Sequence, residues 1–371
     1  HGVRSNLGLE VPVVGVGKLG YPDVAEQALR DGACDMIMLA RPLLADPEWP
    51  RKAYAGRVGE IVPCIGDQEA CLNEFIHGGH IQCTVNPRTG FEEQIPHDAT
   101  PAARPKRVAV VGAGPAGVTC ATVAAERGHQ VTLLERREVA GGMLIPGSMP
   151  RTKYDVANYR DYLRARLEQC ARQHKLEARF NTEASVTLLR QEGYDAVVLC
   201  TGGTLVRPRV EGIDEPHVAQ AVDLLEDPAL AHGADRVVIV GGGDVGCETA
   251  HFLANELPGA ENRRVTVVEM LPHFLKDSCT ANRGYLIHHL EKAGVALWNC
   301  ARLLRVEPGG VVVTRNISPT VPSPYVTWAP VLPENVKNPL ARPIRVEERE
   351  VWLDAGLVLL ATGMEPDPGL Y

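Results

Sequence analysis

Two glycine-rich turns, each lying between an apolar strand and a helix, constrain the fold of this chain more than any other feature. The strands are VAVV and VVIV, and both turns have the spacing G-x-G-x-x-G. The first glycine of such a turn permits a tight bend, the second lets the backbone approach a pyrophosphate, and the third lets the helix pack on the strand. The free amides at the helix N-terminus bind that pyrophosphate. The sequence therefore predicts an α/β chain with two dinucleotide-binding units, whose glycines are Gly112, Gly114 and Gly117 in the first turn and Gly241, Gly243 and Gly246 in the second.

An acidic residue ends the second strand of each predicted unit. Glu135 ends the strand QVTLLE, and Glu269 ends the strand RVTVVE. In a Rossmann-like unit, an acid about 20 residues beyond the first glycine binds the ribose hydroxyls. A carboxylate there also repels the 2′-phosphate of NADPH. Because no arginine directly follows Glu269, we expect NADH rather than NADPH at the second turn.

Sequences around the first turn resemble the FAD domain of flavoproteins that bind two dinucleotides. Gly141 and Gly142 follow Glu135 closely, and YDAVVLCTGG (194–203) is an expected strand that ends in Thr-Gly. The segment AGLVLLATG (355–363) repeats this ending. The resemblance assigns FAD to the first turn and a nicotinamide to the second. It implies FAD-binding roles for Gly112, Gly114, Pro115, Ala116, Gly117, Glu135, Arg136, Gly142, Met143, Thr201, Gly202 and Gly363, and nicotinamide-binding roles for Gly241, Gly243, Asp244, Val245, Gly246 and Glu269.

Neither turn is accompanied by a redox-active pair of cysteines. The segment MLIPGSMPRTK, which follows Gly142, contains no cysteine. A thiol–disulfide reductase needs two thiols beside its flavin, so we do not expect that activity.

Three cysteines are clustered in a glycine-containing loop, PCIGDQEACLNEFIHGGHIQCTVNP. Cys64, Cys71 and Cys83 have the spacing C-x6-C-x11-C, and Asp67 comes three residues after the first. Soft thiolate ligands select zinc or iron–sulfur centres. The alternative is three unligated cysteines in a core. Polar residues and glycines between them favour a ligand loop.

This loop makes a more specific resemblance visible. The chain resembles the C-terminal part of the multidomain old-yellow-enzyme family, which includes 2,4-dienoyl-CoA reductase, 2-enoate reductase and, more distantly, trimethylamine and histamine dehydrogenases. These enzymes join an FMN-binding (β/α)8 barrel to a [4Fe–4S] loop and an FAD/nicotinamide module. The reductases have C-x2-C-x3-C-x11-C ahead of Val-Asn-Pro. This sequence keeps Cys64, Cys71, Cys83 and residues 85–87, but Asp67 stands where the second cysteine belongs. An Asp-ligated four-iron cluster, a three-iron cluster and no cluster are the three outcomes left open.

By the same resemblance, residues 1–62 are the end of the FMN barrel. VGVGKLGYPDVAEQAL resembles the seventh strand, its loop and its helix, and MIMLARPLLADPEWPRKA resembles the eighth strand and helix. The loops after these strands build the phosphate site in such barrels. The resemblance therefore implies contacts of Gly17, Lys18, Ala40 and Arg41 with the FMN phosphate.

The expected domain organisation follows from these segments. Residues 63–104 form the iron–sulfur loop and a linker. The FAD domain comprises residues 105–212 plus 345–371, and the nicotinamide domain is 213–344 with a Pro-rich insertion at 318–343. The family continues to a Gly-Asp motif and a final helix that are absent here, so we interpret the chain as an internal segment of a longer enzyme.

Composition narrows the classes of partner. The net charge of -8 argues against nucleic acid, and no run of about 18 apolar residues predicts a membrane span. The ten cysteines show no disulfide framework, so we expect a reducing cytoplasm. The oligomeric state is not indicated.

The resemblance implies an electron relay. NADH would reduce FAD, and electrons would pass through the iron–sulfur centre to FMN, which would reduce an activated C=C bond in an enoate or enoyl-CoA. Catalytic residues for that last step are not expected in this chain. Two alternatives stay open: an amine dehydrogenase or demethylase of the trimethylamine dehydrogenase type, and a non-catalytic FAD/NAD electron-transfer module.

Overall fold

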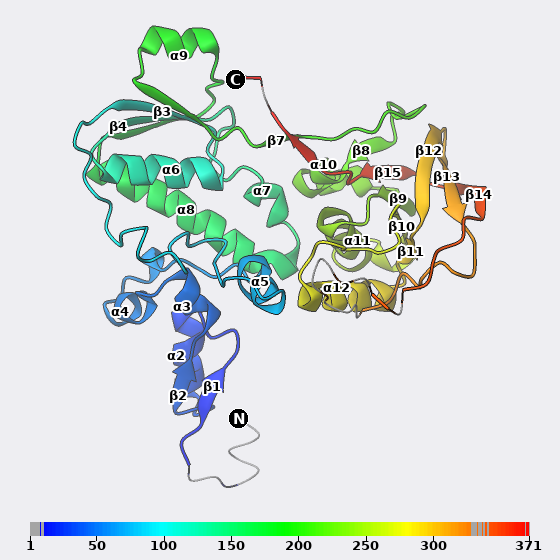
Figure 1. The fold of residues 1–371 in the computed structure, drawn as a ribbon, viewed down its shortest axis with the longest axis horizontal. Coiled ribbons are helices and arrows are strands. Elements are labelled where there is room, and N and C mark those ends of the chain that lie inside the picture. Colours follow the sequence, from blue (N-terminus) through cyan, green and yellow to red (C-terminus); the bar gives the residue numbers. More distant parts are fainter. Residues whose placement is uncertain are drawn as a thin grey trace. The chain divides into compact units, whose positions relative to one another are not determined.

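The protein is described here by a computed structural model that covers residues 8, 11–327, 332, 336, 338–339, 341–367 and 369–370. Packing divides the chain into two units (Figure 1). The first contains residues up to 74 together with 80–144 and 155–200. The second contains residues 75–79, 145–154 and 201 onward.

A four-stranded parallel sheet in the order β5-β4-β3-β6 is the centre of the first unit. Its strands are β3 (Arg107–Val111), β4 (Gln130–Leu134), β5 (Leu176–Arg179) and β6 (Ala196–Leu199). Three helices that lie between these strands along the chain are α6 (Pro115–Glu126), α8 (Tyr154–Gln173) and α9 (Val186–Glu192). Helices α6 and α8 run together along one face of the sheet (Figure 1). Val110 and Leu133 from the strands pack there with Ala121 and Leu163 from these helices.

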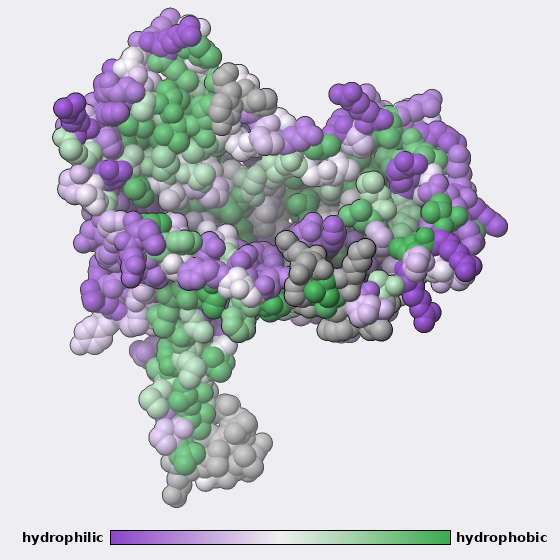
Figure 2. Space-filling view, viewed as in Figure 1, coloured by the Kyte–Doolittle hydropathy of each residue, from purple (hydrophilic) through white to green (hydrophobic). Residues whose placement is uncertain are grey.

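The N-terminal segment is one strand–helix–strand unit. Strand β1 (Val14–Val16) pairs in parallel with β2 (Met36–Met38), and α2 (Pro22–Arg30) connects them. Two short helices follow, α3 (Arg41–Ala45) and α4 (Trp49–Tyr54). Parallel strands are normally covered on both faces. Here Val16 is 68% exposed and Met38 is 54% exposed, and Figure 2 shows apolar side chains gathered over this segment. Two strands alone leave their apolar faces uncovered, and the assignment of this segment to the end of an FMN barrel stays a prediction.

The cysteine loop contains helical turns. A π-helical turn covers Glu69–Asn73 and runs directly into the short helix α5 (Glu74–Ile76). Val62, Ile65 and Val85 from the loop pack against the core of the first unit.

A five-stranded parallel sheet in the order β11-β10-β9-β15-β8 is the centre of the second unit. Alternate residues of β9 point to opposite faces, as the pleat requires. Val237 and Ile239 pack against helices, whereas Val238 and Val240 pack against an antiparallel sheet of three strands. Both faces are therefore covered.

The strands of this parallel sheet are β8 (Val218–Gln220), β9 (Arg236–Val240), β10 (Arg264–Val268), β11 (Ala296–Trp298) and β15 (Leu357–Leu360). The helices are α10 (Ala221–Glu226), α11 (Asp244–Asn255) and α12 (Thr280–Lys292), with α7 (Leu144–Gly147) at the segment shared with the first unit. The antiparallel strands are β12 (Ala301–Glu307), β13 (Gly310–Asn316) and β14 (Glu348–Asp354).

The assignment of residues 345–371 to the FAD domain was wrong. Strand β14 pairs with β13, and β15 lies between β9 and β8 in the nicotinamide sheet. The longest segment of the second unit also begins at Thr201 rather than at 213. The sequence misled because β15 and β6 are both short apolar strands that end in Thr-Gly, and nothing local tells which sheet such a strand joins.

The Pro-rich stretch connects two neighbouring strands. It begins after β13 and ends before β14, which pair antiparallel, so it extends a hairpin connection. Tyr325 fixes its first part, because its hydroxyl donates to the Val295 carbonyl at 2.9 Å. Residues 328–331, 333–335, 337 and 340 of the stretch lie outside the described residues. Within the part of the chain that the structure describes, no helix combines the length and apolarity needed to span a membrane.

Candidate functional site

The first glycine turn has the packing that its spacing predicts. Gly112 has a φ of +99°, and Gly114 precedes the first residue of α6. A Cβ on Gly117 would lie 1.7 Å from the Gly112 carbonyl oxygen, so only a hydrogen fits there. A Cβ on Gly114 would approach nothing closer than the Cα of Gly142, at 3.9 Å. The third glycine is therefore packed tightly, while the second leaves open backbone where a pyrophosphate would bind.

The second turn repeats this arrangement. Gly241 has a φ of +111°, and a Cβ on Gly246 would lie 2.0 Å from the Gly241 carbonyl oxygen. No atom lies within 4 Å of a Cβ built on Gly243. Gly243, Asp244 and Val245 are exposed at the start of α11, so their backbone is accessible.

Glu135 and Glu269 hold their own glycine turns, a role that the sequence did not reveal. Glu135 accepts from the Ala113 amide at 2.6 Å and from the Arg137 amide at 2.9 Å. Glu269 makes the same pair of bonds in the second unit, with two amides at 2.7 Å each, those of Gly242 and Leu271. Both carboxylates are buried. An ionised carboxylate has about four acceptor positions, so each side chain can still bind ribose hydroxyls.

The remaining predicted FAD residues fall in two places. Gly142 lies against the first turn, since its Cβ would be 2.9 Å from the Cα of Gly114. Arg136, Met143 and Ala116 are exposed near this turn in sequence, and Pro115 begins α6. Thr201, Gly202 and Gly363 instead belong to the second unit, at the antiparallel pair formed by β7 (Gly203–Leu205) and β16 (Met364–Pro366). Their proposed contact with FAD stays a prediction.

An ion pair that the sequence did not predict lies beside the second turn. The Lys153 ammonium contacts the Glu248 carboxylate, and both side chains are about one-third exposed. Burial raises the pKa of Glu248, and Lys153 opposes that rise. The Arg151 amide also donates at 2.7 Å to Glu256, the C-cap residue of α11, so residues 151–153 are held both at the helix and at its end. An acid two residues after the last glycine of the fingerprint was the available signal, but its partner is 95 residues away in sequence.

We expect Lys153→Met to destabilise the protein by about 2 kcal/mol, between the ~0.5 kcal/mol of an exposed pair and the ~4 kcal/mol lost when a buried charge loses its partner. The double variant Lys153→Met/Glu248→Gln should recover most of this loss, because no unpaired carboxylate remains. Urea unfolding of the wild type and the single and double variants measures the coupling. Additive effects of the two substitutions would contradict it.

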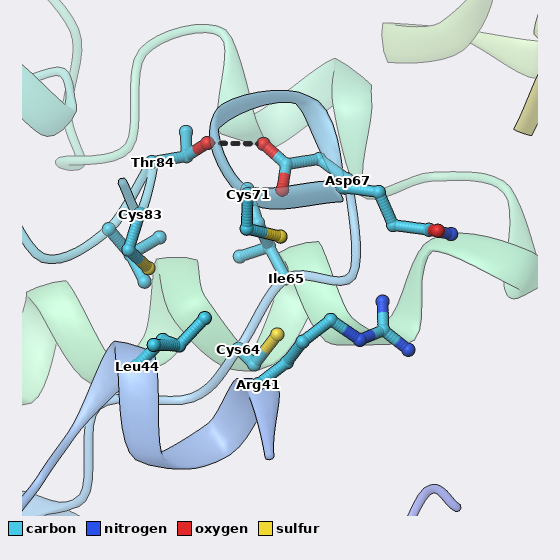
Figure 3. A pocket seen from close by; sticks show the side chains of 10 residues that line it. Arg41, Leu44, Cys64, Ile65, Asp67, Cys71, Cys83 and Thr84 are labelled. Atoms are coloured by element: carbon cyan, nitrogen blue, oxygen red, sulfur yellow. Dashed lines mark hydrogen bonds between the residues drawn. The ribbon is translucent and has the colours of Figure 1, made fainter. Parts of the chain in front are cut away.

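The four predicted ligands of the cysteine loop line one pocket (Figure 3). Cys64, Cys71 and Cys83 all contribute, as does Asp67, whose carboxylate accepts a hydrogen bond from the Thr84 hydroxyl at 2.5 Å. Burial raises the pKa of the Cys64 and Cys83 thiols. Three thiols and a carboxylate around one space fit an iron–sulfur cluster in donor type.

A single metal ion fits this pocket less well. Among the described residues, the one group of potential ligand atoms that all lie within 4.8 Å of one another is elsewhere, formed by Glu126, Cys170 and His174. In that group Glu126 is already paired with Arg166. The cysteine-loop donors are spread more widely, as a multi-atom cluster requires.

A second cavity, of about 60 Å³, shares Arg41 and Cys64 with the cysteine pocket. Lys18 also lines it, and its ammonium pairs with Asp155, which accepts a further hydrogen bond from the Tyr21 hydroxyl. Lys18 and Arg41 follow the carboxyl ends of β1 and β2, after Gly17 and Ala40. Two cations at one cavity suit an anion such as a flavin phosphate, although Asp155 already balances the charge of Lys18.

The sequence of this chain is similar to a known family and to known proteins. Residues 106–371 match the family model described as pyridine nucleotide-disulphide oxidoreductase. The chain belongs to this family. It is similar to the NADH oxidase of Thermoanaerobacter brockii, with 36% identity over 306 residues that cover 82% of this chain and 46% of that protein. It is also similar to the cinnamate reductase of Clostridium sporogenes, with 34% identity over 282 residues, or 75% of this chain and 40% of that protein.

Similarity to a solved structure extends to the N-terminal segment. A 2-naphthoyl-CoA reductase bound to 2-naphthoyl-CoA matches 99% of this chain and 49% of its own chain, with a TM-score of 0.82 and 30% identity. The chain therefore spans about half the length of the relatives it matches. The predicted resemblance to the 2-enoate reductase type is confirmed, and the matching family and relatives imply FAD and NAD(P)H as cofactors.

Proposed function

We propose that this chain serves an enzyme in which NADH supplies electrons for the reduction of an activated C=C bond in an enoate or enoyl-CoA. The second turn would hold NADH, the first FAD, the cysteine loop an iron–sulfur cluster, and the Lys18/Arg41 cavity the phosphate of FMN. When bound, these groups would supply hydride transfer from NADH to FAD and single-electron transfer from FAD through the cluster to FMN. The chain's own residues would bind and orient them.

One observation carries this proposal: Arg41 and Cys64 line both the cysteine pocket and the cavity next to it. A cluster and an FMN phosphate held there would be neighbours. The loop that carries Cys64 also packs through Val62 and Ile65 on the core beneath the first turn. The first turn, the cysteine loop from Cys64 to Cys71 and the Lys18/Arg41 cavity therefore belong to one packed unit.

The second turn would select and orient the electron donor. The exposed amides at the start of α11 would bind the pyrophosphate, and Glu269 would accept from the ribose hydroxyls. The Lys153–Glu248 pair holds residues 151–153 against α11 and so shapes the surroundings of this site.

The substrate class rests on relatives that are named for reducing cinnamate and 2-naphthoyl-CoA. Both compounds have a double bond or aromatic system activated by a carbonyl group. None of the described residues has been assigned to the reduction step itself.

The test uses the full-length protein under anaerobic conditions. We expect NADH to bleach the flavin absorbance, and we expect iron, sulfide and both flavins in the purified protein. Bleaching by a secondary or tertiary amine without bleaching by NADH or NADPH would contradict the proposal. FAD without iron or FMN would instead favour the electron-transfer module.

A further inference from the structure

We propose that Asp67 binds one exchangeable iron of the cluster, so that the site converts reversibly between a four-iron and a three-iron form. This inference deepens the proposed function and rests on it. Cys64, Cys71 and Cys83 would hold the other three irons. The juxtaposition of three thiols and a single carboxylate around one pocket carries the proposal.

Asp67 lies in a stretch of unusual backbone conformation. It lies between Gly66, with a φ of +70°, and Gln68, with a φ of +67°. A left-handed non-glycine residue is uncommon and costs free energy. The π-helical turn that carries Cys71 starts directly afterwards, at Glu69. This backbone conformation brings Asp67 and Cys71, which are four residues apart, to the same pocket.

A neighbouring hydroxyl orients the carboxylate. Thr84, next to Cys83, donates to Oδ2 of Asp67, and Figure 3 shows the second carboxylate oxygen on the side of Cys71. Hydrogen bonds of this kind orient metal-binding carboxylates and tune their affinity. Asp67 is therefore held in the orientation of a ligand by a residue adjacent to another ligand.

Because one of the four proposed ligands is a carboxylate, the iron that it binds would differ chemically from the other three. Thiolates suit iron–sulfur clusters, whereas a carboxylate is a harder and weaker ligand for them. Loss of the Asp67-bound iron balances as [4Fe–4S]²⁺ giving [3Fe–4S]⁺, Fe²⁺ and one electron, which passes to a one-electron oxidant. Reduction and added Fe²⁺ reverse the step.

The experiment titrates the anaerobic full-length protein with ferricyanide and follows released Fe²⁺ with a chelator and the cluster by electron paramagnetic resonance. We expect one iron to be released per cluster, a three-iron signal to appear, and dithionite with Fe²⁺ to restore the original state. In Asp67→Cys, iron release should be at least about tenfold slower. In Thr84→Val, the affinity for the returning Fe²⁺ should fall about tenfold.

Asp98→Cys is the matched control. It adds a thiol to the same segment at an exposed position, so its iron release should equal that of the wild type. A cluster that keeps four irons in both wild type and Asp67→Cys would overturn this inference while leaving the relay intact. A three-iron cluster that takes up no Fe²⁺ would also overturn it. Absence of iron and sulfide from the wild type would instead remove the cluster from the proposed function. If Asp67→Cys does not fold, release and uptake in the wild type alone still decide.

Discussion

Gly117→Ala is expected to remove FAD from the protein. The new methyl group would lie 1.7 Å from the Gly112 carbonyl oxygen, a distance that real contacts do not show. Helix α6 would have to move off the turn, and overpacking of this kind costs about 1–3 kcal/mol or more. Because the open backbone at Gly114 belongs to the same turn, its amides would no longer converge on the pyrophosphate. We expect FAD content to fall more than about tenfold, which corresponds to about 1.4 kcal/mol.

The measurement is FAD per protein after gel filtration, with circular dichroism to show that the variant is folded. Gly59→Ala is the matched control, because a Cβ there has no atom within 4 Å and its φ is not positive. Gly246→Ala should weaken NADH binding while FAD is retained, since it makes the equivalent clash in the other unit. Full FAD occupancy in Gly117→Ala would show that the first turn does not bind this cofactor.

The two turns could be predicted because everything that specifies them is local. Strand, glycines and helix are contiguous, and the clash at Gly117 involves an atom only five residues away. The second role of Glu135 and Glu269 is nearly local too. The sequence suggested only that these carboxylates bind ribose hydroxyls. The amides of the glycine turn also need hydrogen-bond acceptors, and the two carboxylates supply them.

The features that could not be predicted from the sequence depend on contacts between segments that lie far apart along the chain. Strand β15 joins the sheet of β9, more than 100 residues earlier, and its own residues suit either sheet equally well. Lys153 and Glu248 form their pair across a similar separation. In the cysteine loop, spacing predicted the four ligand candidates, but the Thr84–Asp67 hydrogen bond requires the folded loop. Local patterns therefore predicted the binding motifs, while tertiary packing decided which sheet or partner each segment joined.

Glu269→Gln is expected to relax the preference for NADH over NADPH. The carboxylate lies at the end of β10 and is buried beside the second turn, where a 2′-phosphate would meet its negative charge. Removing that charge should relieve repulsion of about 2 kcal/mol, which changes the ratio of kcat/KM values for NADPH and NADH about thirtyfold.

The same substitution should also weaken NADH itself. A glutamine has one acceptor oxygen, so either the Gly242 or the Leu271 amide loses its bond. An unsatisfied buried amide costs about 1–3 kcal/mol. The expected result is therefore a lower kcat/KM for NADH together with a higher relative value for NADPH, a combination that simple destabilisation would not produce.

Glu135→Gln separates the two roles. It removes the equivalent charge and the equivalent hydrogen bond at the first turn, where Ala113 and Arg137 supply the amides. Its FAD retention should fall, but its ratio of NADPH to NADH activity should stay that of the wild type once FAD is added back. Steady-state kinetics with both nucleotides at fixed FAD measure this. An unchanged ratio in Glu269→Gln would show that the specificity lies in other residues, and a changed ratio in Glu135→Gln would exchange the assignments of the two turns.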